Sequence, residues 1–218
     1  MGPSMREHLL RRALRLEALT ISWNVIEAVI AIGAGWLAGS VALVGFGLDS
    51  TIETIAASAL YVRLRAEMKG ADGEETEAHE QRALRIVGVT FFVLALYIIY
   101  EAGSTLWFAE PPQPSRIGIA LAALSLVVMP FLAWAKYRTG EALKSRALIA
   151  DAKETIACSY LSLTLLVGLG ANALWGWWWA DPVAALAMLP WVIREGFEAL
   201  EESSADCATE DSVREQDT

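Results

Sequence analysis

The chain has few of the side chains on which soluble metalloenzymes and secreted domains rely: 218 residues include only two cysteines and two histidines. Cys158 lies in an apolar run and Cys207 in an acidic tail, so the two make no disulfide framework. His8 and His79 both lie outside the apolar runs. Without a His-rich or Ser/His constellation, nothing in the sequence supports an activated-water metal centre, and we do not expect an enzyme or a prosthetic group.

Charge is also scarce, and this scarcity indicates a membrane protein. Charged residues make up 20% of the chain, hydrophobic residues 55%, and the mean hydropathy is +0.40. These values are more apolar than those of a typical soluble domain. The apolar runs do not alternate with polar residues as transmembrane β-strands do. No basic cluster stands clear of the membrane flanks, which argues against a nucleic-acid partner.

Six apolar runs are long enough to cross a bilayer, which requires about 20 residues per helix. They are residues 16–37, 41–62, 86–108, 117–134, 148–174 and 182–197. The first run is too long for a secretory signal and has no convincing cleavage site. We therefore predict an all-α integral membrane protein with six transmembrane helices. We expect a basic tail at 1–15, a six-span domain at 16–200 and an acidic, disordered tail at 201–218.

Basic residues predict the orientation of the spans, since Lys and Arg gather on the cytoplasmic side. Thirteen of them flank one side: Arg6, Arg11, Arg12, Arg15, Arg63, Arg65, Lys69, Arg82, Arg85, Lys136, Arg138, Lys144 and Arg146. The opposite side has only Arg116. We expect both termini to be cytoplasmic and the chain to reside in a bacterial inner (plasma) membrane.

Four potential metal ligands lie inside two of the apolar runs. Asp49 and Glu53 are four residues apart in the second, and Glu154 and Cys158 are four residues apart in the fifth. Residues i and i+4 share one face of a helix, and an ionisable group at membrane depth is a functional hypothesis by default. Asp49 lies nine residues after Ser40, and Glu154 lies nine residues after Ser145. Nine residues correspond to about 13.5 Å of helix. Because these runs cross in opposite directions, both pairs are predicted near the midplane.

The donor types point to a transition metal as cargo. Three carboxylates and one thiolate can complete a tetrahedral site, and the thiolate favours Zn²⁺ or Cd²⁺ over Mg²⁺ or Ca²⁺. Co²⁺, Ni²⁺, Fe²⁺ and Mn²⁺ remain open. Without a cation, such closely spaced acids should hold protons, which a metal must displace. This linkage is a physical basis for metal–proton exchange.

Three further polar residues are accessory candidates. Asp151 shares a face with Glu154, so it is either a fifth ligand or relay, or a local partner of Lys153 or another basic residue. Asn24 and Glu27, in the first run, lie within one turn of each other and are candidates to line the same cavity. Gly45 and Gly47, just before Asp49, permit close helix approach.

Three motifs accompany these residues: 39–43 (Gly-Ser-Val-Ala-Leu) followed by Asp49, the run from Ser145 to Asp151, and 180–186 (Ala-Asp-Pro-Val-Ala-Ala-Leu). With them, the chain from about Glu17 to Glu198 resembles the cation diffusion facilitator (cation efflux) family. The resemblance implies six spans, paired ligands in spans two and five, and export of zinc and related cations against protons. It also implies a short form lacking the usual C-terminal cytoplasmic domain, so a homodimer would form through membrane helices.

The chain departs from the family pattern at three ligand positions. The family commonly has Asp at position 53, His or Asp at 154 and Asp at 158, where this chain has Glu53, Glu154 and Cys158. The position of the site therefore carries over from the resemblance, and the metal preference does not.

The sequence thus predicts a proton-coupled antiporter that exports Zn²⁺ or Cd²⁺ from the cytoplasm. Its expected partners are the lipid bilayer, divalent cations and protons. The alternative is a membrane metal sensor or scaffold that binds metal at the same site without transporting it.

Overall fold

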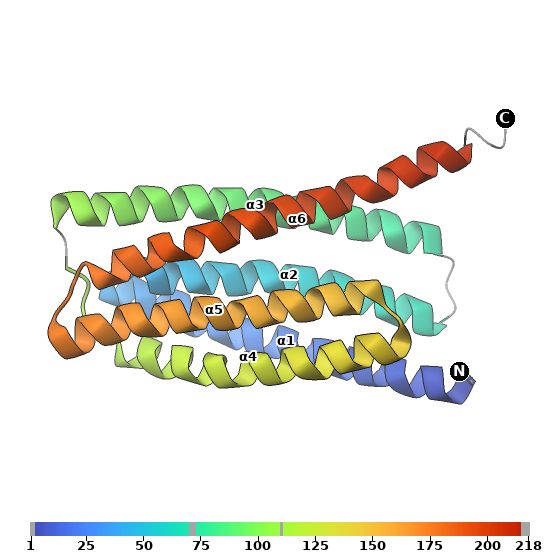
Figure 1. Ribbon diagram of the computed structural model, residues 1–218, viewed down its shortest axis with the longest axis horizontal. Helices are drawn as coiled ribbons and strands as arrows, with labels where there is room; N and C mark the ends of the chain where they lie inside the picture. Colours follow the sequence, from blue (N-terminus) through green and yellow to red (C-terminus); the bar gives the residue numbers. More distant parts are fainter. Residues whose placement is uncertain (1–2, 70–72, 110, 215–218) are drawn as a thin grey trace.

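A computed structural model describes the backbone of residues 3–69, 73–109 and 111–214. The side chains of residues 3, 4, 73–84, 86, 157 and 202–214 lie outside the described part. Within these limits the chain is six α-helices and has no strand (Figure 1): α1 Pro3–Ala38, α2 Val41–Lys69, α3 Gly73–Phe108, α4 Arg116–Leu143, α5 Arg146–Trp175 and α6 Ala180–Arg214. The predicted all-α fold is confirmed.

Five of the helices are long and apolar enough to cross a membrane. The qualifying segments are Met5–Ala38, Val41–Lys69, Val87–Phe108, Arg116–Leu143 and Arg146–Trp175. The sixth helix, α6, packs along α3 and also contacts α5 and α2. The sixth predicted run therefore lies within the same bundle as the five spans.

Three helices extend well beyond their predicted spans. α1 begins at Pro3, α3 at Gly73 and α6 ends at Arg214, so helix covers much of the predicted N-terminal tail and of the predicted C-terminal tail. Proline is favoured in the first turn of a helix, and residues 201–214 contain no glycine or proline that would break one. An apolar run marks only the part of a helix that is suited to the membrane. The helix itself continues until a helix-breaking residue such as glycine or proline ends it. The side chains of the acidic tail from residue 202 onward lie outside the described residues.

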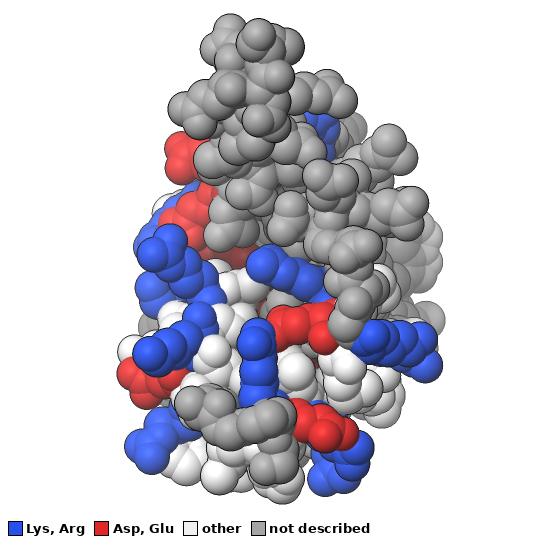
Figure 2. All heavy atoms as spheres, turned by 90° about the vertical axis from the view of Figure 1, so that its right-hand side faces the viewer, with Lys and Arg blue, Asp and Glu red and all other residues white. Residues whose placement is uncertain are grey.

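The helices run antiparallel to their chain neighbours, so their ends gather at two ends of the bundle (Figure 1). α1 begins and α6 ends at the same end, where α2 is followed by α3 and α4 by α5. Figure 2 looks onto this end and shows Lys and Arg side chains spread over the visible described surface. At the opposite end, residues 36–41, 108–117 and 174–181 contain a single basic residue, Arg116.

Large apolar side chains occur both inside the bundle and on its perimeter. The main core joins α2, α3, α5 and α6 and includes Phe46, Ile98, Leu165 and Met188, each almost fully buried. Many other apolar side chains point outward, and Val127 is 70% exposed. Such an apolar perimeter would be unusual for a soluble monomer and suits a surface facing lipid.

A buried carboxylate joins the starts of α2 and α6. Asp181 lies in the first turn of α6, which begins at Ala180. Its carboxylate accepts hydrogen bonds from the hydroxyl of Ser40 (2.5 Å) and the backbone N–H of Ala42 (3.4 Å). It therefore serves the N-terminus of the neighbouring α2, where free N–H groups and the helix dipole favour a negative charge.

Gly47 lets α1 and α2 approach closely, as expected from the sequence. A Cβ atom at Gly47 would lie 2.7 Å from Ile32 Cγ1 and 2.9 Å from the Ile32 backbone nitrogen. A Cβ at Gly45 would meet only the Ile98 side chain at 3.5 Å, an ordinary contact. The close approach of α1 and α2 therefore requires glycine at position 47, whereas position 45 has room for a Cβ atom.

We predict that Gly47→Ala destabilises the bundle by about 1–3 kcal/mol, because overpacking forces the helices apart. Gly45→Ala is the matched control and should be neutral or stabilising, since alanine favours helix and meets no clash. Thermal unfolding in detergent, followed by circular dichroism, measures both. Equal melting temperatures for the two variants would contradict the assigned contact.

Candidate metal site

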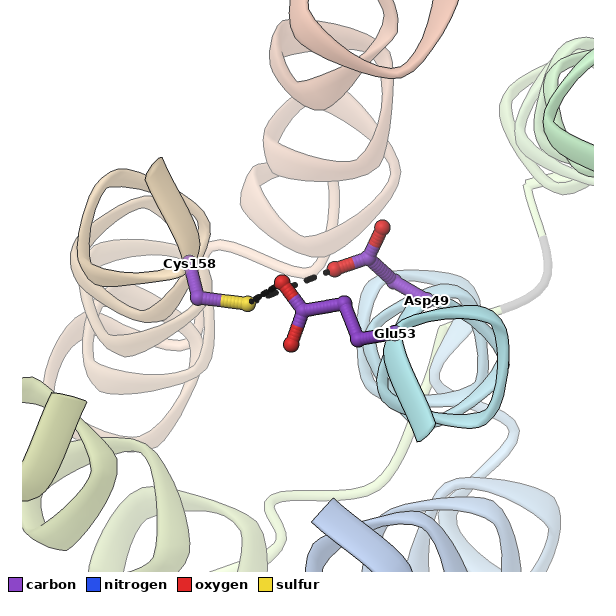
Figure 3. A group of neighbouring side chains, drawn as sticks. All are labelled: Asp49, Glu53 and Cys158. Atoms are coloured by element: carbon purple, nitrogen blue, oxygen red, sulfur yellow. Dashed lines mark hydrogen bonds between the residues drawn. The ribbon is translucent and has the colours of Figure 1, made fainter. Parts of the chain in front are cut away.

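Asp49 and Glu53 lie one turn apart in α2 and point toward α5 (Figure 3). Cys158 approaches them from α5. Asp49 is 3% exposed and Cys158 1% exposed, while Glu53 is half-buried. The i, i+4 spacing turns both α2 carboxylates toward the same point, and the antiparallel packing brings the thiol to it.

The three side chains are in direct contact. The Cys158 thiol donates to Glu53 Oε1 at 2.5 Å and lies 3.7 Å from Asp49 Oδ2. One donor atom from each residue lies within 4.8 Å of the other two. Three acids this close in a poorly hydrated interior need a shared proton or a cation, because full ionisation without either is prohibitively unfavourable.

These separations suit a tetrahedral cation. Zinc bonds of about 2.1 Å to oxygen and 2.3 Å to sulfur put neighbouring ligands about 3.4–3.7 Å apart. The 3.7 Å separation of Cys158 and Asp49 fits this range, whereas the 2.5 Å contact of Cys158 with Glu53 would have to lengthen by about 1 Å to admit a cation. In the described part of the chain, this group of three is the only such cluster of His, Cys, Asp and Glu.

Glu154, the fourth predicted ligand, lies on the wall of the same site. It borders a small cavity of about 20 Å³ together with Asp49 and Glu53. It is not within the 4.8 Å group. The structure therefore brings three of the four predicted donors into contact and puts the fourth on the adjoining cavity wall.

Two of the accessory candidates contact the α2 side of the site. Asn24 Nδ2 donates to Glu53 Oε2 at 3.0 Å, so Glu53 is held by Asn24 on one oxygen and by Cys158 on the other. Glu27 is fully buried and accepts from the Ser50 hydroxyl at 3.0 Å. Among the described residues its second oxygen, Oε1, has no hydrogen-bond partner. Asn24 thus orients Glu53, one of the proposed metal ligands. Glu27 is a buried carboxyl group that contacts Ser50, the residue next to Asp49 in the chain.

The third accessory candidate, Asp151, belongs to a different cluster. Lys136 Nζ lies 2.6 Å from Asp151 Oδ2, 3.1 Å from Glu17 Oε2 and 3.3 Å from Thr155 Oγ1. Lys136 and Glu17 are both 0% exposed. This cluster, which we call the lysine triad (Glu17, Lys136 and Asp151), joins α1, α4 and α5.

The sequence reasoning missed the lysine triad because it counted Lys136 as a loop residue. α4 runs to Leu143, past the predicted end at 134, which carries Lys136 into the bundle. A signal was present, since Glu17 and Asp151 sit at the edges of apolar runs and buried acids require a counter-charge. Lys136 therefore does not contribute to the basic end surface.

A second missed residue, Glu195, lies on α6. It is 6% exposed and borders the same small cavity as Asp49, Glu53 and Glu154. Its signal in the sequence was an acid within the last predicted span. Only the packing of α6 against α2 and α5 reveals which site it faces.

Comparison with known proteins identifies relatives of the whole bundle. Residues 18–206 match the family model of the cation efflux transmembrane domain. The chain is 30% identical over 181 residues to an uncharacterized transporter of Synechocystis sp., covering 82% of this chain and 58% of that protein. It is 26% identical over 189 residues to the manganese efflux system protein MneS of Bacillus subtilis (85% and 65%). It is 24% identical over 208 residues to a cadmium, cobalt and zinc/H(+)-K(+) antiporter of the same organism (93% and 65%).

The chain thus spans about three fifths of the length of the curated relatives it matches. The match covers the helical bundle and includes every residue of the candidate site.

Proposed function

The chain belongs to the cation efflux family, and from this premise we propose that it exports Zn²⁺ or Cd²⁺ from the cytoplasm in exchange for protons. Asp49, Glu53, Glu154 and Cys158 are the proposed ligands. The observation that carries the proposal is the contact of two carboxylates and a thiol, within 4.8 Å of one another, between two membrane-spanning helices. Such groups are too unfavourable in a membrane interior to be retained without use.

The donor set supports the proposed choice of metal. Cys158 supplies a soft sulfur ligand, which zinc and cadmium accept more readily than manganese does. One relative is named for cadmium, cobalt and zinc, and another for manganese. The Cys158 thiol in this cluster favours cadmium or zinc over manganese as the transported metal.

Proton exchange follows from the chemistry of the ligands. A thiolate binds metal only after the thiol loses its proton, and the same holds for a protonated carboxyl. Binding therefore releases protons, and reprotonation of Asp49 or Glu53 promotes release of the metal. The apparent metal affinity should fall as the pH is lowered, which lets a proton gradient drive export.

The surface supports the proposed direction of transport. Figure 2 shows Lys and Arg side chains over the end at which α1 begins, whereas the connecting segments at the opposite end contain only one basic residue, Arg116. Positive residues are retained on the cytoplasmic side. We therefore assign this end, and both termini, to the cytoplasm.

Proteoliposomes test the function directly. Purified chain, reconstituted with an imposed pH gradient, should accumulate Zn²⁺ or Cd²⁺ inside and release protons, as reported by a metal indicator and a pH indicator. Saturable metal binding in detergent without any flux in vesicles would instead identify a metal sensor or scaffold, and overturn the exporter.

Cys158→Asp is predicted to change the selectivity of the site. Replacing sulfur by oxygen should lower the ratio of Cd²⁺ to Mn²⁺ affinity by about tenfold or more, since cadmium loses its soft ligand. Competition binding in detergent measures this ratio, with Cys207→Ser as the matched control for loss of a cysteine. An unchanged ratio would show that Cys158 does not bind the metal.

A further inference from the structure

A second, larger cavity opens beside the proposed metal site. It has a volume of about 440 Å³ and lies between α5 and α6 toward the basic end of the bundle. Its α5 wall includes Lys153 and Glu154, and its α6 wall includes Trp191, Glu195 and Glu198. We call it the α5–α6 pocket.

The α5–α6 pocket and the small site cavity share part of their walls. Glu154, Trp191 and Glu195 border both. Asp49 and Glu53 border only the site cavity, whereas Glu198 borders only the pocket. The three shared residues therefore form the partition between the pocket and the site.

The charges of the α5–α6 pocket are nearly balanced, with three basic residues (Arg146, Lys153 and Arg194) and three acidic ones (Glu154, Glu195 and Glu198). Arg194 Nε lies 2.5 Å from Glu198 Oε1, and its guanidinium lies over the Trp191 ring, 5.2 Å from the centroid. Arg146 and Lys153 repel a cation. Of the three acids, Glu154 and Glu195 also border the site cavity, so they attract a cation toward the site.

We propose that divalent cations reach the site through the α5–α6 pocket and that Glu195 hands them to Asp49 and Glu53. Glu195 is a transfer residue that binds the cation transiently, and it is not one of the four ligands proposed for the resting site. α6 runs beside the cluster formed by α2 and α5 (Figure 3), so a carboxylate on it can face pocket and site in turn. This inference rests on the proposed function, since it requires a metal site at Asp49 and Glu53.

A carboxylate at position 195, between the pocket and the site, has a physical role in cation transfer. A cation leaving the hydrated pocket must give up water, and a negatively charged oxygen on the wall replaces part of that shell. Because the charges of the whole pocket balance, attraction of a cation is local to the partition. Removing Glu195 leaves Glu154 as the one acid of the partition.

Stopped-flow binding of Cd²⁺ in detergent tests the proposal without requiring transport. In a Cys207→Ser background, the thiolate-to-cadmium charge-transfer absorption reports arrival of the metal at Cys158. Glu195→Gln should slow association by about tenfold or more, while the equilibrium affinity changes by less than about threefold, because dissociation along the same route slows as well.

Glu198→Gln is the matched control, because it removes the same charge from the α5–α6 pocket at a residue that does not border the site cavity. Its association rate should stay within about threefold of the parent. Glu195→Asp keeps the charge but withdraws the carboxylate by one methylene, and should slow association severalfold. This second variant tests the reach of residue 195 if Glu195→Gln does not fold.

Three results would overturn the inference. The first is a parental association rate in both Glu195 variants, and the second is equal slowing in Glu195→Gln and Glu198→Gln. The third is faster dissociation with lost affinity in Glu195→Gln, which would make Glu195 a ligand of the resting site. In each case a normal charge-transfer band in the parent protein leaves the proposed metal site standing. Absence of that band in the parent would instead refute the site itself and the inference with it.

Discussion

Replacing Asp49 by Asn is expected to lower metal uptake into proteoliposomes by about 100-fold or more, at the upper end of the effect of disturbing a metal site. The amide has nearly the shape of the carboxylate but no negative charge, so helix packing should be kept. It cannot exchange a proton for a cation, and it leaves the buried metal with one fewer compensating charge. Asp49 is 3% exposed, so water cannot replace it easily.

Metal-dependent proton release should disappear together with uptake, because both depend on the same carboxyl group. Glu101→Gln is a suitable control, since Glu101 borders a separate pocket with Tyr97 and Pro112 at the other end of the bundle. That variant should transport as the parent does. Parental uptake by the Asp49→Asn protein, at parental amounts in the vesicles, would remove Asp49 from the site.

Lys136→Met is expected to cause the largest loss of stability, about 3–5 kcal/mol, which is the cost of breaking a buried ion pair by removing one partner. Glu17 and Asp151 would then face each other without a counter-charge, and Glu17 is fully buried. The melting temperature in detergent, followed by size-exclusion chromatography, measures the loss. Lys69→Met, the same change at an exposed position at the end of α2, is the control and should change little.

The triple variant Lys136→Met, Glu17→Gln, Asp151→Asn separates charge from packing. Removing all three charges should restore most of the stability, because no ionised group is then left buried without a partner. Failure of the triple variant to recover would mean that the packing of the Lys136 side chain, rather than its charge, holds α1, α4 and α5 together. Equal stability of Lys136→Met and the parent would contradict the assigned contacts.

The helices could be predicted from the sequence because their signal is local. A run of about 20 apolar residues is required by the thickness of the bilayer wherever the helix ends up. The helix ends were predicted less well. α3 begins at Gly73 and α4 continues to Leu143, since a polar helix extends past the membrane without any mark in the hydropathy. That extension placed Lys136 inside the bundle instead of in a loop.

The site could be predicted in part for the same reason. Spacing of four residues on one helix is enough to put Asp49 and Glu53 on a common face. A similar depth for Cys158 also follows once the fifth run is known to be antiparallel, whereas the contact itself requires α5 to lie beside α2. Glu195 and the lysine triad have no comparable local signal, because each depends on which helix lies opposite. Asp151 shares a face of α5 with Glu154, yet its partner is Lys136 on α4, which also pairs with Glu17 on α1.

By itself, then, the sequence determined a membrane bundle with acids and a thiol at i, i+4 positions, because hydropathy and helix periodicity act along the chain. The tertiary structure decided which of the candidate acids share one site, which one pairs with a buried lysine, and that α6 adds Glu195 to the partition. Those outcomes depend on distances between helices, which are set by close contacts such as that of Gly47 with Ile32. No pattern within a single helix specifies them.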